Sequence, residues 1–565
     1  MTGSLPDTPR LAIESAISTL ASSARTWAEL PVADKAGRLR DLRSRFAEVA
    51  DDIVAAGLAA KDLDERYAGE EWVSGPLSVI RTMRFLEDSL AGIAATGRVP
   101  ISDSAIRERP DGQVAVDVLP GDGWDRFLYP RWRAEVRMEP GIPLSAARSH
   151  IGGIHTKPGT ATPAVAAVLG AGNVSSITPL DVIHKLFVEG HVVIAKCHPM
   201  NEYIGAHLES AFATLVEEGA VRFVYGGPEV GRLLTDHGGV DEVHVTGSER
   251  THDAIVWGTG DEAAERRSRG RPRLTKRVTS ELGNVSPVIV VPGSWSARQL
   301  RHQAEHVATQ VLHNAGHNCN AAEVLVLPEA WPQRAEFVDA IASAMESRPP
   351  RGAYYPGSGD RFDRVIGSGS RVRVFGERRL GSVPSAIVED VDPNENSPAF
   401  GEEAFCHVLA TTLIAADDPV EYLDRVESFC NEHLRGTLNA TLLVDPSTAR
   451  SLGPRLARTV TALRYGTVAV NVWAAAGFPL GVVPWGAYPG HTLDDVQSGV
   501  GFVHNARLID RPEKTVIRAP FVQIPTPPWS VFHRRSGPAL RAATRFEAAP
   551  GPLRLAKLLG PAMRG

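Results

Sequence analysis

The chain has 565 residues, more than a single hydrophobic core usually organises, so we expect two or three structural units. Its hydrophobic fraction of 43% and charged fraction of 22% are those of an ordinary soluble protein. The formal net charge of −6 provides no electric field that would attract nucleic acid, so no nucleic-acid partner is predicted.

The cysteines are too few for a disulfide framework in so long a chain. They are Cys197, Cys319, Cys406 and Cys430, and they show no CxxC spacing that would indicate a metal site. The first residues, MTGSLPDTPRLAIESA, carry acids and lack the apolar core of a signal peptide. A reduced, cytoplasmic location is therefore predicted, with no metal.

The run between Arg464 and Asp494 contains no Asp, Glu, Lys or Arg, and this raises the question of a membrane span. Glycine and proline interrupt the run at eight places, which an ordinary spanning helix would not tolerate. We expect buried strand and pocket-lining loop here, and no stable membrane insertion.

In chain order, the first predicted elements are helices over residues 9–95. Apolar residues recur there at three- and four-residue spacings among charges, as in Leu39, Leu42, Phe46, Val49 and Ile53. The next segment, 98–150, is rich in Gly and Pro and contains alternating runs such as VAVDVL and RAEVRM. It is predicted to form an extended hairpin or arm.

From residue 163 the pattern becomes that of alternating strands and helices. The runs AVAAVLG, HVVIAK, VRFVYGG and DEVHVTG are short and apolar, and helical segments separate them, which predicts a parallel sheet. A second α/β series begins near VSPVIVV and continues through AEVLVLP. Two such units leave a cleft between them where a cofactor and a substrate can meet.

The final segment, 515–565, is proline-rich and basic, with eight Arg or Lys residues and the single acid Glu547. We expect it to dock on an acidic surface of a neighbouring subunit, or to be disordered, rather than to bind an anionic membrane. Prolines 550, 552 and 561 interrupt any long amphipathic helix.

Two residues near and after the middle of the chain have complementary chemistry. Cys319 lies in HNAGHNCNAAEVLVLP, and Glu281 lies upstream in SELGNVSPVIVV. A thiolate adds readily to an aldehyde carbon, the resulting hemithioacetal is a good hydride donor, and a carboxylate can activate water against the thioester. The pair therefore predicts oxidation of an aldehyde through a covalent thioester.

At these motifs the sequence resembles the aldehyde dehydrogenase superfamily, over roughly residues 160 to 505. The resemblance implies an α/β fold with two Rossmann-type domains and a small oligomerisation arm. It implies Cys319 as the nucleophile, Glu281 as the general base, and Asn173 as the amide that holds the oxyanion together with the Cys319 NH. The cofactor it implies is NAD or NADP, and the assembly a homodimer or homotetramer.

The same resemblance implies the coenzyme contacts. Lys196 matches a lysine that hydrogen-bonds the adenine ribose, and VTGSERTHDAI matches the turn that holds the pyrophosphate with Thr246, Gly247 and Ser248. Glu403 matches a glutamate that binds the nicotinamide ribose, and Phe405 a phenylalanine that packs against the ring.

The chain departs from the family pattern at four positions. Gly172 replaces an aromatic residue before Asn173, and Asn284 replaces a second glycine after Gly283, where an added side chain would narrow the channel or move the glutamate. Pro199 replaces a glutamate common in NAD-preferring members, which leaves coenzyme choice open. His252 stands where the family has a glycine and could lie beside a phosphate.

These similarities divide the chain into six predicted parts. They are the helical beginning of the coenzyme-binding domain (1–97), the arm (98–150), the coenzyme-binding domain (151–284), the catalytic domain (285–485), an oligomerisation strand segment (486–514) and the basic tail (515–565). Trp473, Phe478 and Trp485 either wall an apolar substrate tunnel or belong to an ordinary core.

The predicted function is NAD(P)-dependent oxidation of an aldehyde, with a hydrophobic substrate indicated by the apolar stretch near the end. One alternative is a CoA-dependent acyl reductase on the same fold, which would not need Glu281. Another is a catalytically silent homologue with a structural or binding role, which the four departures keep open.

Overall fold

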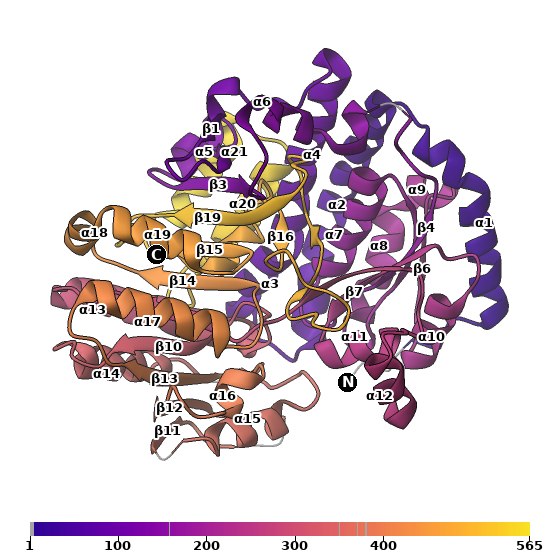
Figure 1. Cartoon of the computed structure of the whole chain (residues 1–565). Coiled ribbons are helices and arrows are strands. Elements are labelled where there is room, and N and C mark those ends of the chain that lie inside the picture. Colours follow the sequence, from indigo (N-terminus) through magenta and orange to yellow (C-terminus); the bar gives the residue numbers. More distant parts are fainter. Residues whose placement is uncertain (1–4, 158, 350, 370, 379–380) are drawn as a thin grey trace.

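The computed structural model describes the whole chain except residues 1–4, 158, 350, 370, 379 and 380. The first predicted part, 1–97, therefore begins outside the described residues. Two β-sheets lie side by side, each covered by helices (Figure 1). Among the described residues, no helix combines the length and the apolar character needed to cross a membrane.

The N-terminal helices α1 (Arg10–Ala28), α2 (Val32–Ala60) and α4 (Ser78–Thr96) form where the three- and four-residue periodicity predicts them. In α1 the buried positions Ile13, Ile17, Leu20 and Ala24 lie on one face, which packs against the first sheet. Helix α2 contacts both α4 and α8 (Gly205–Ala211), so these helices belong to the same core as the first sheet.

The first sheet has six strands in the order β17-β8-β7-β4-β5-β6. Its parallel strands are β4 (Val165–Leu169), β5 (Val192–Lys196), β6 (Val221–Val224), β7 (Glu242–Gly247) and β8 (Arg277–Leu282). The crossover helices include α7 (Ile177–Ile183), α10 (Pro228–Asp236), α11 (Glu249–Val256) and α12 (Gly260–Ser268). This is the parallel α/β unit that the alternating runs predict.

The second sheet has eleven strands in the order β1-β2-β3-β19-β15-β14-β9-β10-β13-β12-β11. Its α/β part comprises β9 (Ser286–Val290), β10 (Ala322–Pro328), β11 (Arg371–Phe375), β12 (Ser385–Val391), β13 (Val408–Ile414), β14 (Asn439–Leu443) and β15 (Thr467–Val470). Helices α13 (Ala297–Leu312), α14 (Arg334–Glu346), α15 (Ser358–Ile366), α17 (Pro419–Glu432), α18 (Pro446–Leu452) and α19 (Pro454–Ala462) cover it. The uncharged run after Arg464 is buried strand and loop, as predicted.

The segment 98–150 forms an antiparallel arm of β1 (Ile106–Glu108), β2 (Val114–Leu119) and β3 (Arg133–Met138). Strand β19 (Pro512–Arg518) pairs antiparallel with β3 and parallel with β15. The arm thus continues the second sheet of its own chain. The residues predicted as an oligomerisation segment, 486–514, contribute two short strands. Strand β17 (Gly499–Val500) pairs with β8, and β18 (Phe502–Val503) pairs with Trp485–Gly486, so both pair inside the chain. The homo-oligomer stays a prediction.

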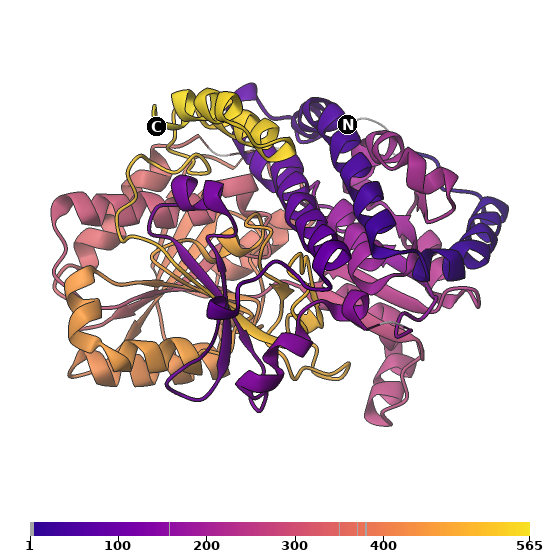
Figure 2. The same ribbon diagram turned by 90° about the horizontal axis from the view of Figure 1, so that it is seen from above.

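The basic tail is ordered within its own chain, so the expectation of disorder is wrong, and docking on a neighbouring subunit stays a prediction. The tail forms α20 (Ser536–Ala548) and α21 (Pro552–Ala562), and α20 packs on α2, α3 (Ala68–Trp72) and α4, as Figure 2 shows in yellow beside violet. Pro552 occupies the first turn of α21, where the missing NH costs nothing, so this proline begins a helix. The single acid of the tail, Glu547, is buried against Arg81 and Arg84.

Candidate active site

The predicted site residues gather at the carboxyl ends of the parallel strands of the first sheet. Asn173 follows β4, Lys196 ends β5, Gly247 ends β7, and Glu281 is the penultimate residue of β8. This edge of an α/β sheet is where ligands usually bind, because helix N-termini and loops converge there. Cys319 approaches the same edge from the loop between α13 and β10.

The nucleophile loop, residues 313–320, has an unusual backbone. Asn314, Ala315 and Gly316 have φ of 52°, 58° and 70°, so three successive residues are left-handed. A Cβ on Gly316 would lie 2.5 Å from the backbone of Cys406, so only glycine fits there. The tight turn directs Cys319 toward the first sheet.

Side-chain amides hold this loop together. The Asn314 Nδ2 donates to the carbonyl oxygens of Asn173 and His317, at 3.1 Å each, and the Asn318 Nδ2 donates to the His313 carbonyl at 2.9 Å. These bonds tie the loop to itself and to Asn173 through backbone carbonyl oxygens. Asn314 and Asn318 thus shape the loop that carries Cys319.

Two buried ion pairs anchor the loop to the N-terminal helices. Glu70 pairs with Arg351 and accepts the Asn314 backbone NH at 2.6 Å. Burial alone would raise the pKa of Glu70, but Arg351 and His313 together with these hydrogen bonds bring it below its usual value. Lys61 lies 2.7 Å from Glu71 and donates to the Asn314 Oδ1 at 3.2 Å. Sequence patterns do not reveal these ion pairs, because their partners are distant along the chain.

The Cys319 thiol and the Glu281 carboxyl lie close enough for each to shift the pKa of the other; Glu281 is buried, and Cys319 is half-buried at the end of a cavity. Burial, followed by the nearby charges of Glu281 and Glu403, raises the pKa of the Cys319 thiol well above its usual range. Burial also raises the pKa of Glu281, to about 8, although Trp485 lowers it by donating from Nε1 to Glu281 Oε1 at 3.0 Å. The structure therefore holds a thiol and a poised carboxyl together.

Asn173 lies directly beside the nucleophile loop. Its Nδ2 donates to the His317 carbonyl at 2.9 Å, and its own carbonyl accepts from Tyr354 at 2.8 Å. An amide nitrogen carries two hydrogens, so one remains for a ligand in the cavity that Asn173 and Cys319 both line. The His198 ring packs directly against Gly172, where the family has an aromatic residue. A Cβ at this position would lie 2.3 Å from that ring, so glycine fits here and a larger residue would not.

Asn284, which replaces a glycine of the family pattern, has both ends of its amide bonded inside the protein. The side chain is buried, its Nδ2 donates to the Asn439 carbonyl at 3.1 Å, and its Oδ1 accepts from Ser286 at 2.9 Å. Its effect on the channel or on the position of Glu281 stays a prediction.

Lys196 is largely buried at the end of β5, and burial lowers its pKa. Its Nζ donates to the Cys197 carbonyl at 3.3 Å. Two carboxylates, Glu202 and Asp7, act electrostatically on Lys196. Glu202 accepts backbone NH groups of Leu5 and Gly226, at 2.9 and 3.3 Å, and Glu202 and Asp7 together bring negative charge to a place where Pro199 supplies none.

The turn after β7 differs in detail from its predicted role. The Thr246 hydroxyl donates to Asp181 at 2.8 Å, so its hydrogen is already used inside the protein. Ser248 caps α11 by accepting from the Thr251 NH at 3.2 Å, and nothing lies within 4 Å of a Cβ placed on Gly247. The backbone around Gly247 is thus open to a ligand. His252 is buried inside α11 rather than beside this turn, with Asp253 as its partner at 3.2 Å.

Glu403 and Phe405 lie opposite Gly283, between the two sheets. A Cβ on Gly283 would lie 1.8 Å from the Glu403 Oε1, so this glycine makes room for the carboxyl group. The Oε1 is buried and has no hydrogen-bond partner among the described residues. Burial and the charges of Glu323 and Glu281 raise the pKa of Glu403 well above its usual range. An acceptor in this state suits a ligand hydroxyl, and the Phe405 ring lies nearby, 5.1 Å from that of Tyr355.

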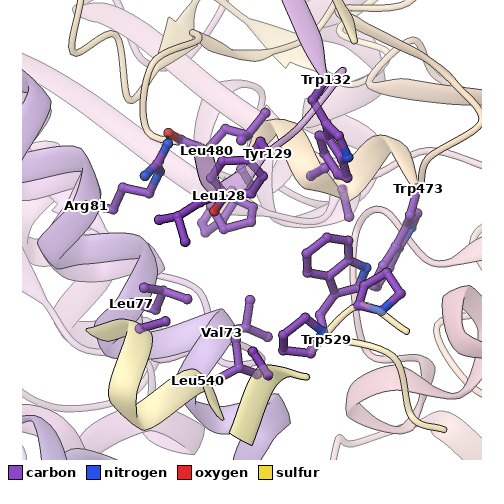
Figure 3. Close-up of a pocket in the computed structure, with 18 of the residues that line it drawn as sticks. Val73, Leu77, Arg81, Leu128, Tyr129, Trp132, Trp473, Leu480, Trp529 and Leu540 are labelled. Carbon is purple, nitrogen blue, oxygen red and sulfur yellow. Dashed lines mark hydrogen bonds between the residues drawn. The ribbon is translucent and has the colours of Figure 1, made fainter. Parts of the chain in front are cut away.

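An apolar cavity of about 500 Å³ leads to Cys319 (Figure 3). Trp473 and Phe478 line it, as the tunnel interpretation predicts, whereas Trp485 contacts Glu281 instead. The cavity is also lined by residues that could not be assigned to it from the sequence: Val73, Leu77, Tyr129, Trp132, Trp529 and Leu540. Several of them come from the arm and the tail.

Comparison with known proteins supports the superfamily assignment. The sequence profile of the Aldehyde dehydrogenase family matches residues 162–352. The N-succinylglutamate 5-semialdehyde dehydrogenase of Sphingopyxis alaskensis is 28% identical over 165 residues, which are 29% of this chain and 31% of the relative. The chain thus spans under a third of the length of the curated relatives it matches.

Solved structures are similar over nearly the whole chain. The glyceraldehyde-3-phosphate dehydrogenase of Methanocaldococcus jannaschii, complexed with NADP, has a TM-score of 0.60 at 14% identity and covers 91% of this chain and 95% of its own. An indole-3-acetaldehyde dehydrogenase complexed with NAD+ has a TM-score of 0.59 at 16% identity, covering 91% of this chain and 90% of its own. The fold is that of these enzymes, and residues 162–352 match the Aldehyde dehydrogenase family.

Proposed function

We propose that this chain oxidises an aldehyde to a carboxylic acid with NAD or NADP, through a thioester on Cys319. The observation that carries the proposal is the proximity of the Glu281 carboxyl to the Cys319 thiol, which lines a cavity wide enough for a small molecule. A nucleophile and a base close together are what a two-step acyl mechanism requires.

In the first step the Cys319 thiol gives up its proton to solvent, the resulting thiolate adds to the aldehyde carbon, and the carbonyl oxygen becomes an oxyanion. The free hydrogen of the Asn173 amide and the Cys319 backbone NH hold that oxyanion. Such a donor is worth about 3 kcal/mol in the transition state. The nicotinamide, when bound, supplies the hydride acceptor that turns the adduct into a thioester.

In the second step Glu281 takes a proton from water, and the water oxygen attacks the thioester carbon. The Cys319 sulfur leaves and the carboxylic acid is released. The base must be ionised for this step, and Trp485 favours the ionised form because its NH donates to the carboxylate.

The residues fit a nicotinamide dinucleotide between the two sheets. Glu403 would accept a hydroxyl of the nicotinamide ribose with its unpartnered Oε1, and the open backbone at Gly247 would take the pyrophosphate. Lys196 would meet the adenine ribose. Asp7 and Glu202 beside Lys196 oppose a 2′-phosphate, so NAD is the proposed preference.

The test is coenzyme reduction over a panel of aldehydes, with NAD and NADP in parallel, on the full chain and on Cys319→Ala. The variant is expected to lose turnover and to retain coenzyme binding, because the thiol does chemistry and does not anchor the dinucleotide. Reduction that requires CoA would favour an acyl reductase, and binding of coenzyme without reduction of any kind would favour a silent homologue.

A further inference from the structure

The two terminal helices form part of the wall of the cavity that reaches Cys319. Leu540, Ala543, Phe546 and Glu547 of α20 and Leu558, Leu559 and Ala562 of α21 line it. The other sides of the cavity are lined by Val73 and Leu77, which lie between α3 and α4, by Trp473, and by Trp529 from the segment that precedes α20. Figure 3 shows Leu540, Val73 and Leu77 facing Trp473 and Trp529 across an open space.

The helical pair is fixed to the rest of the chain by charge as well as by apolar packing. Glu547 contacts Arg81 and lies 2.6 Å from Arg84, both on α4. Arg81 in turn lies 2.7 Å from Asp125. Three segments, α4, the arm and the tail, meet at this buried cluster, so the cavity wall is a built part of the fold.

The buried charges that line the cavity, Arg81 and Glu547, are paired within the protein. Arg81 is buried and satisfied by Asp125 and Glu547, and the remaining cation of the lining, Arg131, is exposed. Among the described lining residues no buried cation is thus left to receive a substrate carboxylate, whose uncompensated burial would cost several kcal/mol. An aldehyde with a terminal carboxylate is disfavoured, and an uncharged apolar group is favoured.

The outer part of the same cavity is apolar and open. Phe127, Ile524 and Met563 line it with exposed fractions of 55%, 70% and 63%, whereas the Cys319 side chain at the inner end is half-buried. An apolar path therefore runs from a solvent-exposed rim to the nucleophile. A volume of about 500 Å³ lies within the range of sites that enclose most of a small ligand.

We infer that α20 and α21 form a specificity element that selects aldehydes carrying a large, uncharged apolar group and excludes aldehydes carrying a carboxylate. This inference rests on the proposed function, since it assigns the carbonyl of that substrate to Cys319 and its apolar group to the space against the terminal helices. Each methylene group that the cavity encloses adds about fourfold to kcat/KM until the space is filled.

The sharpest test is a pair of neighbouring substitutions on α20. Ala543 lines the cavity, and Ala542 lies on the outer face of the same helix beside Arg541 and Arg545. Ala543→Phe should shorten the longest straight-chain aldehyde that is oxidised efficiently and lower kcat/KM for decanal at least tenfold while changing that for propanal less than twofold. Ala542→Phe should leave both values unchanged.

A second readout does not need turnover. Quenching of tryptophan fluorescence by 1-decanol, which cannot be oxidised as an aldehyde, should report binding near Trp473 and Trp529, and Ala543→Phe should weaken it relative to Ala542→Phe. Equal decanol affinities and equal chain-length profiles in the two variants would overturn the inference, as would faster oxidation of succinic semialdehyde than of decanal. If no aldehyde is oxidised while decanol binding still distinguishes the two variants, the proposed reaction is wrong, but the role of α20 and α21 in binding an apolar group in the cavity is supported.

Discussion

Glu281 is the residue whose ionisation controls the proposed hydrolysis. Its pKa is raised to about 8 by burial, so the carboxyl is mostly protonated at pH 7 and becomes a base as the pH rises. The rate of the hydrolytic step should therefore increase with pH and level off above about 8. Single-turnover decay of the acyl-enzyme, followed between pH 6 and 9.5, measures this directly.

Trp485→Phe should move the inflection of the pH–rate profile to higher pH. In the parent protein the Trp485 hydrogen bond stabilises the ionised Glu281 carboxylate, and the variant lacks this bond. A tenfold smaller ionised fraction of Glu281 at pH 7 would lower the hydrolytic rate there about tenfold. Trp331→Phe is the matched control, because Trp331 is also buried but donates to the Gly293 carbonyl, away from the site. An inflection that stays in place in Trp485→Phe would remove Trp485 from the tuning of the base.

Asp7 gives a prediction for coenzyme choice. Asp7→Asn removes one of the two carboxylates that act on Lys196 and should raise kcat/KM for NADP relative to NAD by several-fold, in line with a screened surface interaction of about 1 kcal/mol. Glu14→Gln, an exposed change on α1, serves as the control. If the ratio of kcat/KM for NADP to that for NAD is unchanged in Asp7→Asn, the N-terminal segment does not influence coenzyme choice.

At the scale of elements, the nucleophile loop depends on ion pairs from helices that the motif does not include. Arg351→Met would leave Glu70 buried without its cation, which should cost about 3–5 kcal/mol of the free energy of unfolding. Urea denaturation measures the loss. The double variant Glu70→Gln with Arg351→Met should recover most of it, because Gln can still accept the Asn314 NH. A double variant as unstable as the single one would contradict this account of the loop.

The motif residues could be predicted from the sequence because each stands in a short run whose order is informative by itself. Cys319, Glu281 and Asn173 do meet, since strands and loops at one sheet edge converge. The supporting residues Lys61, Glu70 and Arg351 could not be predicted, because ion pairs between distant segments leave no local pattern. The partners of the Asn284 amide could not be predicted for a similar reason, because the sequence does not say which distant segments a side chain will contact.

At the scale of the whole molecule, the tail and the arm show where composition misleads. Basic, proline-rich residues predict a docking or disordered tail, yet Pro552 stands in the first turn of α21, and the outward-facing bases leave an apolar face for the cavity. The α/β units follow from periodicity. The pairing of β19 with β3 does not, because these partners lie hundreds of residues apart.

Arg81 on α4 forms ion pairs with Asp125 of the arm and Glu547 of the tail, so its loss should lower the stability of the whole chain. Arg81→Met leaves Asp125 and Glu547 buried near Arg84 alone and should lower the free energy of unfolding by about 3–5 kcal/mol. It should also loosen α20, so limited proteolysis is expected to cleave between residues 523 and 535 faster than in the parent. Arg10→Met, on the exposed face of α1, is the control. A parent-like cleavage rate in Arg81→Met would show that apolar packing alone holds the tail.

The central claim is a thioester on Cys319 that Glu281 hydrolyses. A rapid-mix measurement of coenzyme reduction by Glu281→Gln tests it most directly, because the first step needs mainly the thiolate and the second needs the base. The predicted result is a burst of reduced coenzyme, close to one equivalent per active site, followed by turnover at least a hundredfold slower than in the parent. Steady turnover at the parent rate, or no reduction in the burst and none afterwards, would contradict the assignment of these two residues.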